Sequence, residues 1–269
     1  MIGVGIVAFN RPAYLRRLLA SLAAQTEKDG AQYHLFLDGA VNKWSGKRYA
    51  YQHEIDQCTR LFARAELPAK WVTLRGSNVG VGVNTLEAIE ELTATYERVI
   101  LMEDDVVLSP HWLRLACILF EDMPAAAFSF SPGFKRAGTD RGAMVSRRSY
   151  MWCECFTADR WGKVRETYLD FYNKFIADRD YYSRDLDAIR EWHRVHGIDE
   201  KVTSQDAGRL TAITVNGLNR YQCAVNRAYG IGKNGIHFSP DLYAFEQFAK
   251  QTPFIFDDDA TREGFVWDD

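Results

Sequence analysis

Short apolar runs alternate with stretches of helical apolar spacing over the first 120 residues. The apolar runs at 2–9, 34–37, 70–74 and 98–102 predict buried strands. Apolar residues recur at helical spacing over 12–22, 49–65 and 83–96, and Ser109-Pro110 opens a further helix that runs to about residue 120. This order is typical of an α/β fold with a mostly parallel sheet and helices on both faces.

The second half of the chain has a less regular pattern. The elements predicted there are a strand at 126–130, helical stretches at 168–196 and 204–216, and an extended segment at 221–226. The polar, glycine-bearing stretch 135–148 predicts a loop. The acidic end, 257–269, predicts a segment that is exposed or partly disordered. We therefore expect one α/β domain with two halves, 1–125 and 126–269.

Three of the first four predicted strands end at polar side chains. The strand 98–102 runs into Glu103-Asp104-Asp105, the first strand ends before Asn10-Arg11, and the second ends at Asp38. A buried strand cannot continue through three unpaired carboxylates. Carboxyl ends of parallel strands meet at one edge of a sheet, where open α/β folds bind ligands. Carboxylates clustered there suit a hard divalent cation and, through it, a phosphate, although a solvated acidic loop is the alternative.

Composition excludes some classes of protein and leaves others open. The 269 residues are 47% hydrophobic and 26% charged, as in ordinary globular domains, and a net charge of -3 gives no support to nucleic-acid binding. Five cysteines form no regular framework, which favours reduced thiols and a cytoplasmic setting. We expect no signal peptide and no transmembrane segment, since no apolar stretch approaches ~20 residues. Peripheral contact with the inner face of a membrane is compatible with this sequence.

A glycine-rich segment at 76–84 follows the third strand and precedes a helix. Such a turn can bring backbone N–H groups close to a phosphate or a sugar. The segment has no Gly-Lys-Ser/Thr, and its glycine spacing differs from that of the dinucleotide fingerprint. The alternative is a tight connection between strand and helix.

In their order, these features resemble the GT-A fold glycosyltransferases. The match is to inverting enzymes of the family 2 type, with a likeness also to N-acetylglucosaminyltransferase I. The residues that carry it are Val7 to Pro12, Asp38-Gly39, Arg75, Asn78 to Gly80, Asn84 and Leu101 to Asp105. The segment from Tyr150 to Trp161 looks like the Trp-rich acceptor-side segment of some bacterial members. The likeness covers 1–120 well and returns in patches to about His237.

The resemblance implies a role for each matching residue. Asn10 and Arg11 would lie near the nucleotide, Asp38 would contact the base or ribose, and Arg75 and Asn78 would line the nucleotide pocket. Glu103-Asp104-Asp105 matches the "DXD" element, which implies Asp105 as the direct ligand of Mn²⁺ or Mg²⁺. Glu103 and Asp104 would lie near the ribose or a metal-bound water, and His237 would be a further metal ligand.

The reaction also needs a base that deprotonates the acceptor hydroxyl. Asp206 falls where the family has a catalytic acidic residue at a helix start, although many relatives have Glu-Asp where this chain has Gln205-Asp206. The alternative is that Asp206 caps the helix, with Ser204 as the other capping candidate. Glu154 and Asp159 are the other candidates for the base.

The resemblance therefore implies a metal-dependent inverting glycosyltransferase. It would move a hexosyl or N-acetylhexosaminyl group from a nucleoside-diphosphate sugar, with a UDP-sugar favoured, to a glycan or glycolipid hydroxyl in bacterial surface polysaccharide synthesis. Residues 1–125 would bind the nucleotide sugar and 126–269 the acceptor. The alternatives are a sugar-phosphate nucleotidyltransferase and a non-catalytic nucleotide-sugar-binding module. The first would need a Gly-rich, Lys/Arg-bearing loop after the first strand, where this chain has Asn10-Arg11-Pro12.

Overall fold

The computed structural model describes residues 1–134, 142–146, 152–235, 239–245 and 265–268. Its strands are β1 (Ile2–Ala8), β2 (Ala31–Leu37), β3 (Ala69–Leu74), β4 (Arg98–Glu103), β5 (Val106–Leu108), β6 (Ala127–Gly133), β7 (Gly142–Val145), β8 (Cys153–Thr157), β9 (Asn219–Asn226), β10 (Ala228–Gly230) and β11 (Val266–Asp268). Its helices are α1 (Pro12–Ala23), α2 (Gln52–Arg64), α3 (Gly80–Thr95), α4 (Trp112–Glu121), α5 (Ala158–Phe175), α6 (Leu186–Val195), α7 (Gln205–Val215) and α8 (Pro240–Phe245), with short 3₁₀ helices η1 (Lys28–Gly30) and η2 (Tyr181–Ser183).

One large sheet runs through the molecule. In the described part of the chain its order is β11-β7-β9-β6-β8-β4-β1-β2-β3, and β10 and β5 form a separate antiparallel pair. Strands β3, β2, β1 and β4 are parallel neighbours, whereas β8 runs antiparallel to both β4 and β6. The α/β class with a mostly parallel sheet is therefore confirmed.

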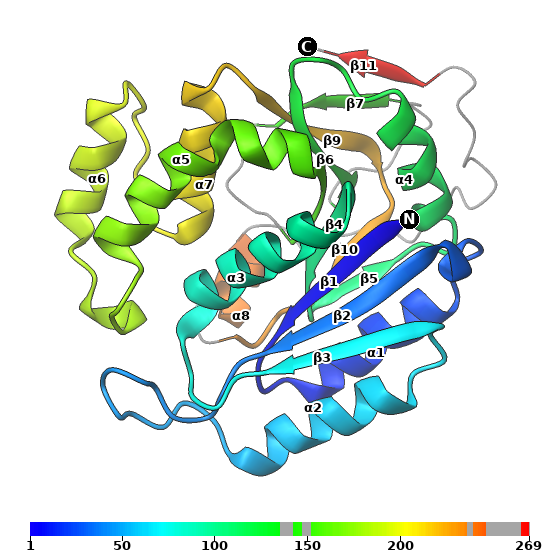
Figure 1. Cartoon of the computed structure of the whole chain (residues 1–269), viewed down its shortest axis with the longest axis horizontal. Helices are drawn as coiled ribbons and strands as arrows, with labels where there is room; N and C mark the ends of the chain where they lie inside the picture. Colours follow the sequence, from blue (N-terminus) through cyan, green and yellow to red (C-terminus); the bar gives the residue numbers. More distant parts are fainter. Residues whose placement is uncertain (135–141, 147–151, 236–238, 246–264, 269) are drawn as a thin grey trace.

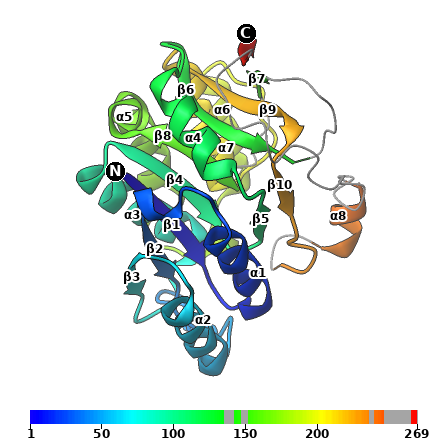
Figure 2. The same cartoon turned by 90° about the vertical axis from the view of Figure 1, so that its right-hand side faces the viewer.

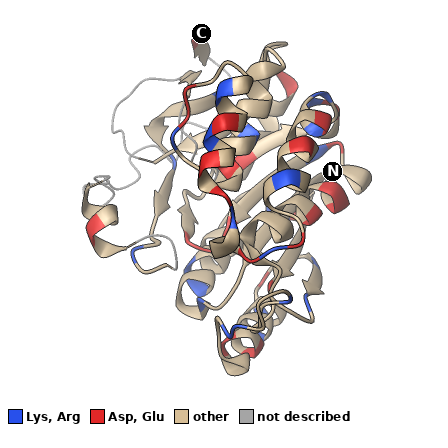
Figure 3. Cartoon of the chain, turned by 90° about the vertical axis from the view of Figure 1, so that its left-hand side faces the viewer, with Lys and Arg blue, Asp and Glu red and all other residues tan. Residues whose placement is uncertain are grey.

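Two hydrophobic clusters cover the two faces of the sheet. One joins the strands to α1, α2 and α4, and the other joins them to α3, α5, α6 and α7 (Figure 1). Strand β1 is buried along its whole length because it lies between β2 and β4 with helices on both sides. Acidic and basic residues are interspersed along the helices on the side shown in Figure 3.

The predicted elements of the first half are confirmed, with shifts of a few residues at their ends. Helix α1 begins at Pro12, where the fixed ring of proline suits the first helical turn. The helix predicted from Ser109-Pro110 begins at Trp112 instead. The strand predicted at 34–37 extends back to Ala31.

The second half departs further from its pattern. The predicted loop at 135–148 is wrong over Gly142–Val145, which forms β7 between β9 and β11. The acidic end contains β11, while 257–264 and 269 lie outside the described residues. The helical region predicted at 168–196 contains the end of α5, then η2 and α6. Strand β8 was not predicted, because Glu154 interrupts its apolar pattern.

The carboxyl ends of β1, β2 and β4 meet at one edge of the sheet, as predicted. Val7 pairs with Glu103, and Ala8 pairs with Leu37. Helix α8 lies at the periphery beside β10 (Figure 2), where the Tyr243 hydroxyl donates to the Gly230 carbonyl at 2.8 Å. No helix in the described part of the chain is both long and apolar enough to cross a membrane.

Candidate functional site

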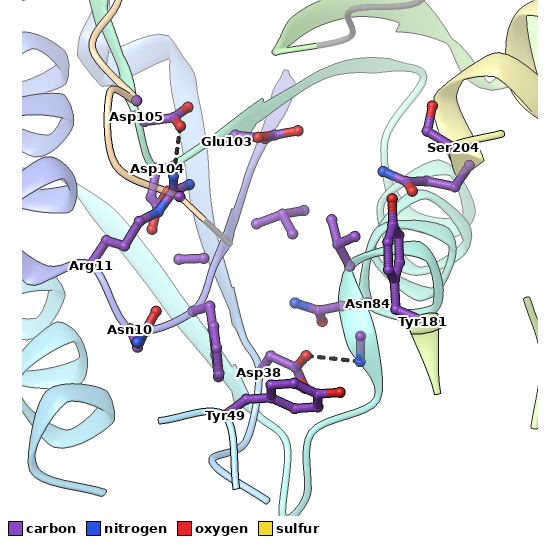
Figure 4. Close-up of a pocket in the computed structure, with 18 of the residues that line it drawn as sticks. Asn10, Arg11, Asp38, Tyr49, Asn84, Glu103, Asp104, Asp105, Tyr181 and Ser204 are labelled. Carbon is purple, nitrogen blue, oxygen red and sulfur yellow. Dashed lines mark hydrogen bonds and ion pairs between the residues drawn. The ribbon is translucent and has the colours of Figure 1, made fainter. Parts of the chain in front are cut away.

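A cavity of about 850 Å³ opens at this edge of the sheet. It lies between the carboxyl ends of β1, β2 and β4 and segments of the second half, including the start of α7 and the chain after β10. The predicted site residues that line it are Asn10, Arg11, Asp38, Asn78, Glu103, Asp104, Asp105 and Asp206. Figure 4 shows most of these side chains around the cavity.

Arg11 forms an ion pair with two of the three consecutive carboxylates. It follows β1 and directly precedes the first turn of α1, so its side chain reaches the end of the neighbouring strand β4. Its Nη1 donates to Oδ2 of Asp105 at 2.8 Å, and its Nη2 donates to Oδ1 of Asp104 (Figure 4). Burial alone would lower the pKa of Arg11, but Asp104, Asp105 and Glu103 raise it above its ordinary value.

Glu103 is a third acidic side chain beside this pair, and in the described part of the chain Arg11 forms its ion pairs with Asp104 and Asp105 instead. Burial and the charges of Asp105 and Asp206 raise the pKa of Glu103 well above its usual range. Burial also raises the pKa of Asp104 to about 6, although Arg11 opposes this shift. The Asp104 side chain is 0% exposed, and its Oδ2 has no hydrogen-bond partner in the described part of the chain. The cluster therefore has three acidic side chains beside one paired guanidinium.

The described residues alone do not form a complete metal cage here. Within the described residues, no three His, Cys, Asp or Glu side chains are arranged to hold one metal ion together. Hard cations such as Mg²⁺ are commonly held by one or two carboxylates, with water and substrate oxygens as the other ligands. The carboxylate oxygens of Asp105 and the unbonded Oδ2 of Asp104 fit that kind of site.

The segment after β10 lies directly against this cluster. The N–H of Ile231 donates to the carbonyl oxygen of Asp105 at 2.8 Å. A Cβ atom at Gly232 would collide with the carboxylate of Asp105. Glycine is therefore required at 232 for this close approach.

Asp38 uses its whole carboxylate to shape the start of α3. Its Oδ1 accepts from the N–H groups of Gly39 and Val79, and its Oδ2 accepts from Gly80 N and from Asn78 Nδ2, all at 2.8–2.9 Å. Gly80 has a φ of 80°, which favours glycine. Burial raises the pKa of Asp38 to about 6, and the backbone donors oppose that shift.

These bonds favour a structural interpretation of the glycine-rich segment. The N–H groups of Val79 and Gly80 bind Asp38 and are not left for a phosphate. A carboxylate offers about four acceptor positions, and four donors already occupy those of Asp38. The predicted contact of Asp38 with a base or ribose stays a prediction.

Arg75 is not among the residues that line the cavity, and its predicted place at the nucleotide stays a prediction. Its Nη1 pairs with Glu87 at 2.6 Å, and its Nε donates to Asn84 Oδ1 at 3.2 Å. Both partners belong to α3, which follows Arg75 closely in the sequence and so offers the nearest acceptors. His237, the predicted further metal ligand, lies outside the described residues.

Asp206 lies in the first turn of α7 and lines the cavity. The cap of this helix is Ser204, whose hydroxyl oxygen accepts from the N–H of Ala207 at 3.2 Å. The Asp206 side chain is 16% exposed and lies 3.7 Å from Arg209. Burial raises the pKa of Asp206 to about 6, although Arg209 opposes the shift.

The two other candidates for the base lie elsewhere. Glu154 is the second residue of β8 and is 0% exposed, and its carboxylate binds Arg220, Arg209 and the Ser129 hydroxyl. Asp159 is exposed in the first turn of α5 and pairs with Lys163 at 3.0 Å. Neither residue lines the cavity. Among the three candidates for the base, only Asp206 is in the cavity.

Sequence patterns missed one wall of the cavity. Asn42 and Tyr49 come from the segment between β2 and α2, and Asp180, Tyr181 and Tyr182 come from η2 and its cap. Figure 4 shows the rings of Tyr49 and Tyr181 at this wall. The paired tyrosines after Asp180 are the one local signal that draws attention to this segment, since irregular segments carry no periodic pattern.

No protein-family model matches this chain, and no curated protein sequence matches it either. Among solved structures, TarS of S. aureus is 16% identical over 84% of this chain, with a TM-score of 0.49. TarS 1–349 in complex with UDP-GlcNAc is 14% identical over 93% of this chain and 65% of its own, with a TM-score of 0.48. The galactosyltransferase LgtC, in complex with donor and acceptor sugar analogues, is 13% identical over 82% of this chain and 73% of its own, with a TM-score of 0.44. This chain spans 37% of the TarS chain.

Proposed function

We propose that this protein is a GT-A type glycosyltransferase that moves a sugar from a nucleoside-diphosphate sugar to an acceptor hydroxyl. The observation that supports the proposal most is the content of a single cavity. The cavity is lined by three consecutive acidic residues, Glu103 to Asp105, by the guanidinium of Arg11 and by the separate carboxylate of Asp206. A cation-binding group, an anion-binding group and a base are what this reaction requires.

The donor end of the proposed site is built from Arg11 and the consecutive carboxylates. Asp105 would hold Mn²⁺ or Mg²⁺, and the diphosphate of the donor would complete the coordination. When bound, the ion supplies positive charge that stabilises the departing diphosphate. Arg11 would exchange part of its contact with Asp105 for a forked contact with phosphate oxygens, which suits a planar guanidinium. Asn10 and Asn78 would face the nucleotide, for which UDP is the favoured identity.

Asp206 would act as the base in a direct displacement with inversion. The acceptor oxygen would give its proton to Asp206 and form a bond to the anomeric carbon. The bond from that carbon to the diphosphate oxygen would break, and its electron pair would leave with the diphosphate. A pKa of about 6 suits this role, because the carboxylate is ionised at neutral pH and still more basic than an ordinary aspartate.

We propose a glycan or glycolipid of bacterial surface polysaccharide as the acceptor, and a hexosyl or N-acetylhexosaminyl group as the transferred sugar. Trp152 lines the cavity and offers an aromatic surface of the kind that packs against sugar rings.

Nucleotide binding with and without Mn²⁺ tests the proposed site directly. We expect UDP with Mn²⁺ to raise the unfolding temperature of the wild type, because a ligand that binds only the folded state adds about 2.7 kcal/mol at 100 times its Kd. Asp105→Asn should lose most of this shift. Asp159→Asn is the matched control, since that carboxylate is exposed and outside the cavity.

The outcomes of this experiment separate the rival functions. Binding of UDP without turnover of any UDP-sugar, with candidate acceptors supplied, would favour a non-catalytic binding module. Formation of a nucleotide sugar from UTP and a sugar 1-phosphate would favour a nucleotidyltransferase. Failure of every nucleoside diphosphate to bind, with or without Mn²⁺, would rule out the proposed function.

A further inference from the structure

A continuous series of polar side chains connects the end of β2 to the second half of the protein. It begins at Asp38, which accepts from Asn78 at 2.8 Å, and Asn78 in turn accepts from Nδ2 of Asn42 at 3.2 Å. The Ser45 hydroxyl lies 3.1 Å from Oδ1 of Asn42 and 2.5 Å from Oδ2 of Asp180. Because it has one proton, it donates to one of these two oxygens at a time. Every member of this series except Ser45 lines the cavity.

Asp180 belongs to the second half of the chain and contacts side chains of the first half. Its carboxylate accepts from the Tyr49 hydroxyl at 2.9 Å and from the Tyr182 N–H at 3.2 Å, in addition to Ser45. Tyr49 and Ser45 are 131 and 135 residues away in the sequence. Asp180 is 8% exposed, so its bonds face little competition from water.

The segment that Asp180 holds has little structure of its own. Between β2 and α2 it makes two isolated bridges, Val41 to Arg48 and Asn42 to Asn78, and contains no helix or longer strand. Nevertheless, Tyr49 from this segment forms part of the cavity wall. Lys47 lies over the rings of both Tyr49 and Tyr182, at 4.8 and 5.4 Å from their centroids. The two halves of the chain therefore meet at this wall through one carboxylate and three aromatic and cationic groups.

We propose that Asp180 is a positioning residue of the donor subsite. By fixing Ser45 and the Tyr49 hydroxyl, it holds the segment 42–49 against the cavity and makes nucleoside binding depend on a residue of the second half. This inference rests on the proposed function for the identity of the ligand. The tether itself, from Asp180 to Tyr49, does not depend on that identity.

The test combines nucleotide affinity with backbone protection. Asp180→Ala should weaken the binding of UDP with Mn²⁺ about tenfold by calorimetry, the scale of a lost hydrogen bond to a charged group. The KM for a UDP-sugar should rise by the same factor, with less than a twofold change in kcat. In the absence of nucleotide, amides of 42–49 should exchange faster, while those of β1 and β4 keep their wild-type rates.

A double-mutant cycle distinguishes the positioning of Tyr49 by Asp180 from a general destabilisation of the fold. Tyr49→Phe removes only the hydroxyl, and in the Asp180→Ala background it should have no further effect on UDP affinity, because the bond is already lost. Asp187→Ala is the control, since that side chain on α6 is 94% exposed. If Asp180→Ala does not fold, Asp180→Asn answers the same question with one acceptor oxygen retained.

Two results would overturn the inference. One is wild-type UDP affinity together with wild-type exchange at 42–49 in the Asp180 variant. The other is an effect of Tyr49→Phe that simply adds to that of Asp180→Ala. If the wild type binds no nucleotide, the proposed function fails, and the exchange measurement still decides whether Asp180 holds this segment.

Discussion

Buried Glu154 and the carboxylates at the end of β4 differ in how their charge is balanced. Glu154 in β8 forms ion pairs with Nε of Arg220 at 2.7 Å and with Nη2 of Arg209 at 3.2 Å. It also accepts a hydrogen bond from the Ser129 hydroxyl at 2.6 Å. Burial alone would raise the pKa of Glu154, but the two arginines and Ser129 lower it below its ordinary value. This carboxylate is stabilised as an anion within the sheet.

The carboxylates at the end of β4 have the opposite balance. Arg11 pairs with Asp104 and Asp105, while Glu103 meets the negative charges of Asp105 and Asp206. Burial is the largest cause of the raised pKa values of Glu103, Asp104 and Asp206; a neighbouring carboxylate adds to each shift, and Arg11 or Arg209 opposes it. The comparison teaches that burial alone does not identify a functional carboxylate. A surplus of negative charge beside a cavity does so better than the presence of an acidic residue.

Of the substitutions that test this comparison, Asp206→Asn should have the largest effect, which is on the rate of sugar transfer. If Asp206 is the base, transfer should slow by about 10²–10⁴-fold, while UDP affinity and the unfolding temperature change little. The wild-type rate should fall as the pH decreases through about 6, because the protonated acid cannot accept the proton of the acceptor. Steady-state transfer rates between pH 5 and 8 would check this. Transfer by the variant at the wild-type rate would remove Asp206 from the role of base, and Asp159→Asn is the matched control.

Glu154→Ala should have the next largest effect, a loss in the free energy of unfolding. The change leaves Arg209 and Arg220 buried without this carboxylate, which typically costs about 3–5 kcal/mol. Urea unfolding measures the loss. Because the pKa of Glu154 is lowered in the folded state, its contribution to stability is fully present at pH values above its ordinary pKa of 4.5. That contribution is lost as the pH falls through the pKa of the folded state. The acid limb of the stability curve should therefore be shallower in Glu154→Gln.

The control for this prediction is an ion pair at the surface. Glu191→Ala removes a carboxylate that pairs with Arg194 on α6, where both side chains are more than half exposed, and such pairs contribute about 0–1 kcal/mol. Equal losses for Glu154→Ala and Glu191→Ala would mean that the buried group is not a structural element.

The smallest expected effect is a gain in stability from Glu103→Gln. Removal of one charge relieves repulsion by Asp105 and Asp206, so we expect a gain of about 1 kcal/mol at neutral pH in buffer with a chelator. The same urea assay measures it. A loss of stability in this variant would show that the chain already balances the charge of Glu103, and the contrast with Glu154 would fail.

Local patterns predicted the part of the fold that depends on neighbours in the sequence. The strands β1, β2 and β4 end at polar residues, and parallel pairing brings those ends together, so the edge with Arg11, Asp38 and Glu103 to Asp105 could be predicted. The partners of Arg75, Asn84 and Glu87, lie on the next helix, and the sequence does not show which way such a side chain turns.

The features that escaped prediction depend on partners far apart in the chain. A glutamate inside a strand reads as a surface residue unless its partners are known, and Arg220 is 66 residues from Glu154. The same holds for the wall of the cavity, where Asp180 and Tyr49 are 131 residues apart. In both places a polar group is buried only because tertiary structure supplies its hydrogen bonds.

The ion pair of Arg11 has a consequence for the order in which ligands bind. In this structure the guanidinium already serves as the counter-ion of Asp105, so a divalent cation that takes Oδ2 of this carboxylate would have to displace it. A nucleoside diphosphate offers Arg11 another anion and lowers the cost of that displacement. By thermodynamic reciprocity, the cation must then strengthen nucleotide binding by the same factor. If the proposed function is right, one arginine makes the two ligands cooperative even though each touches a different part of the cluster.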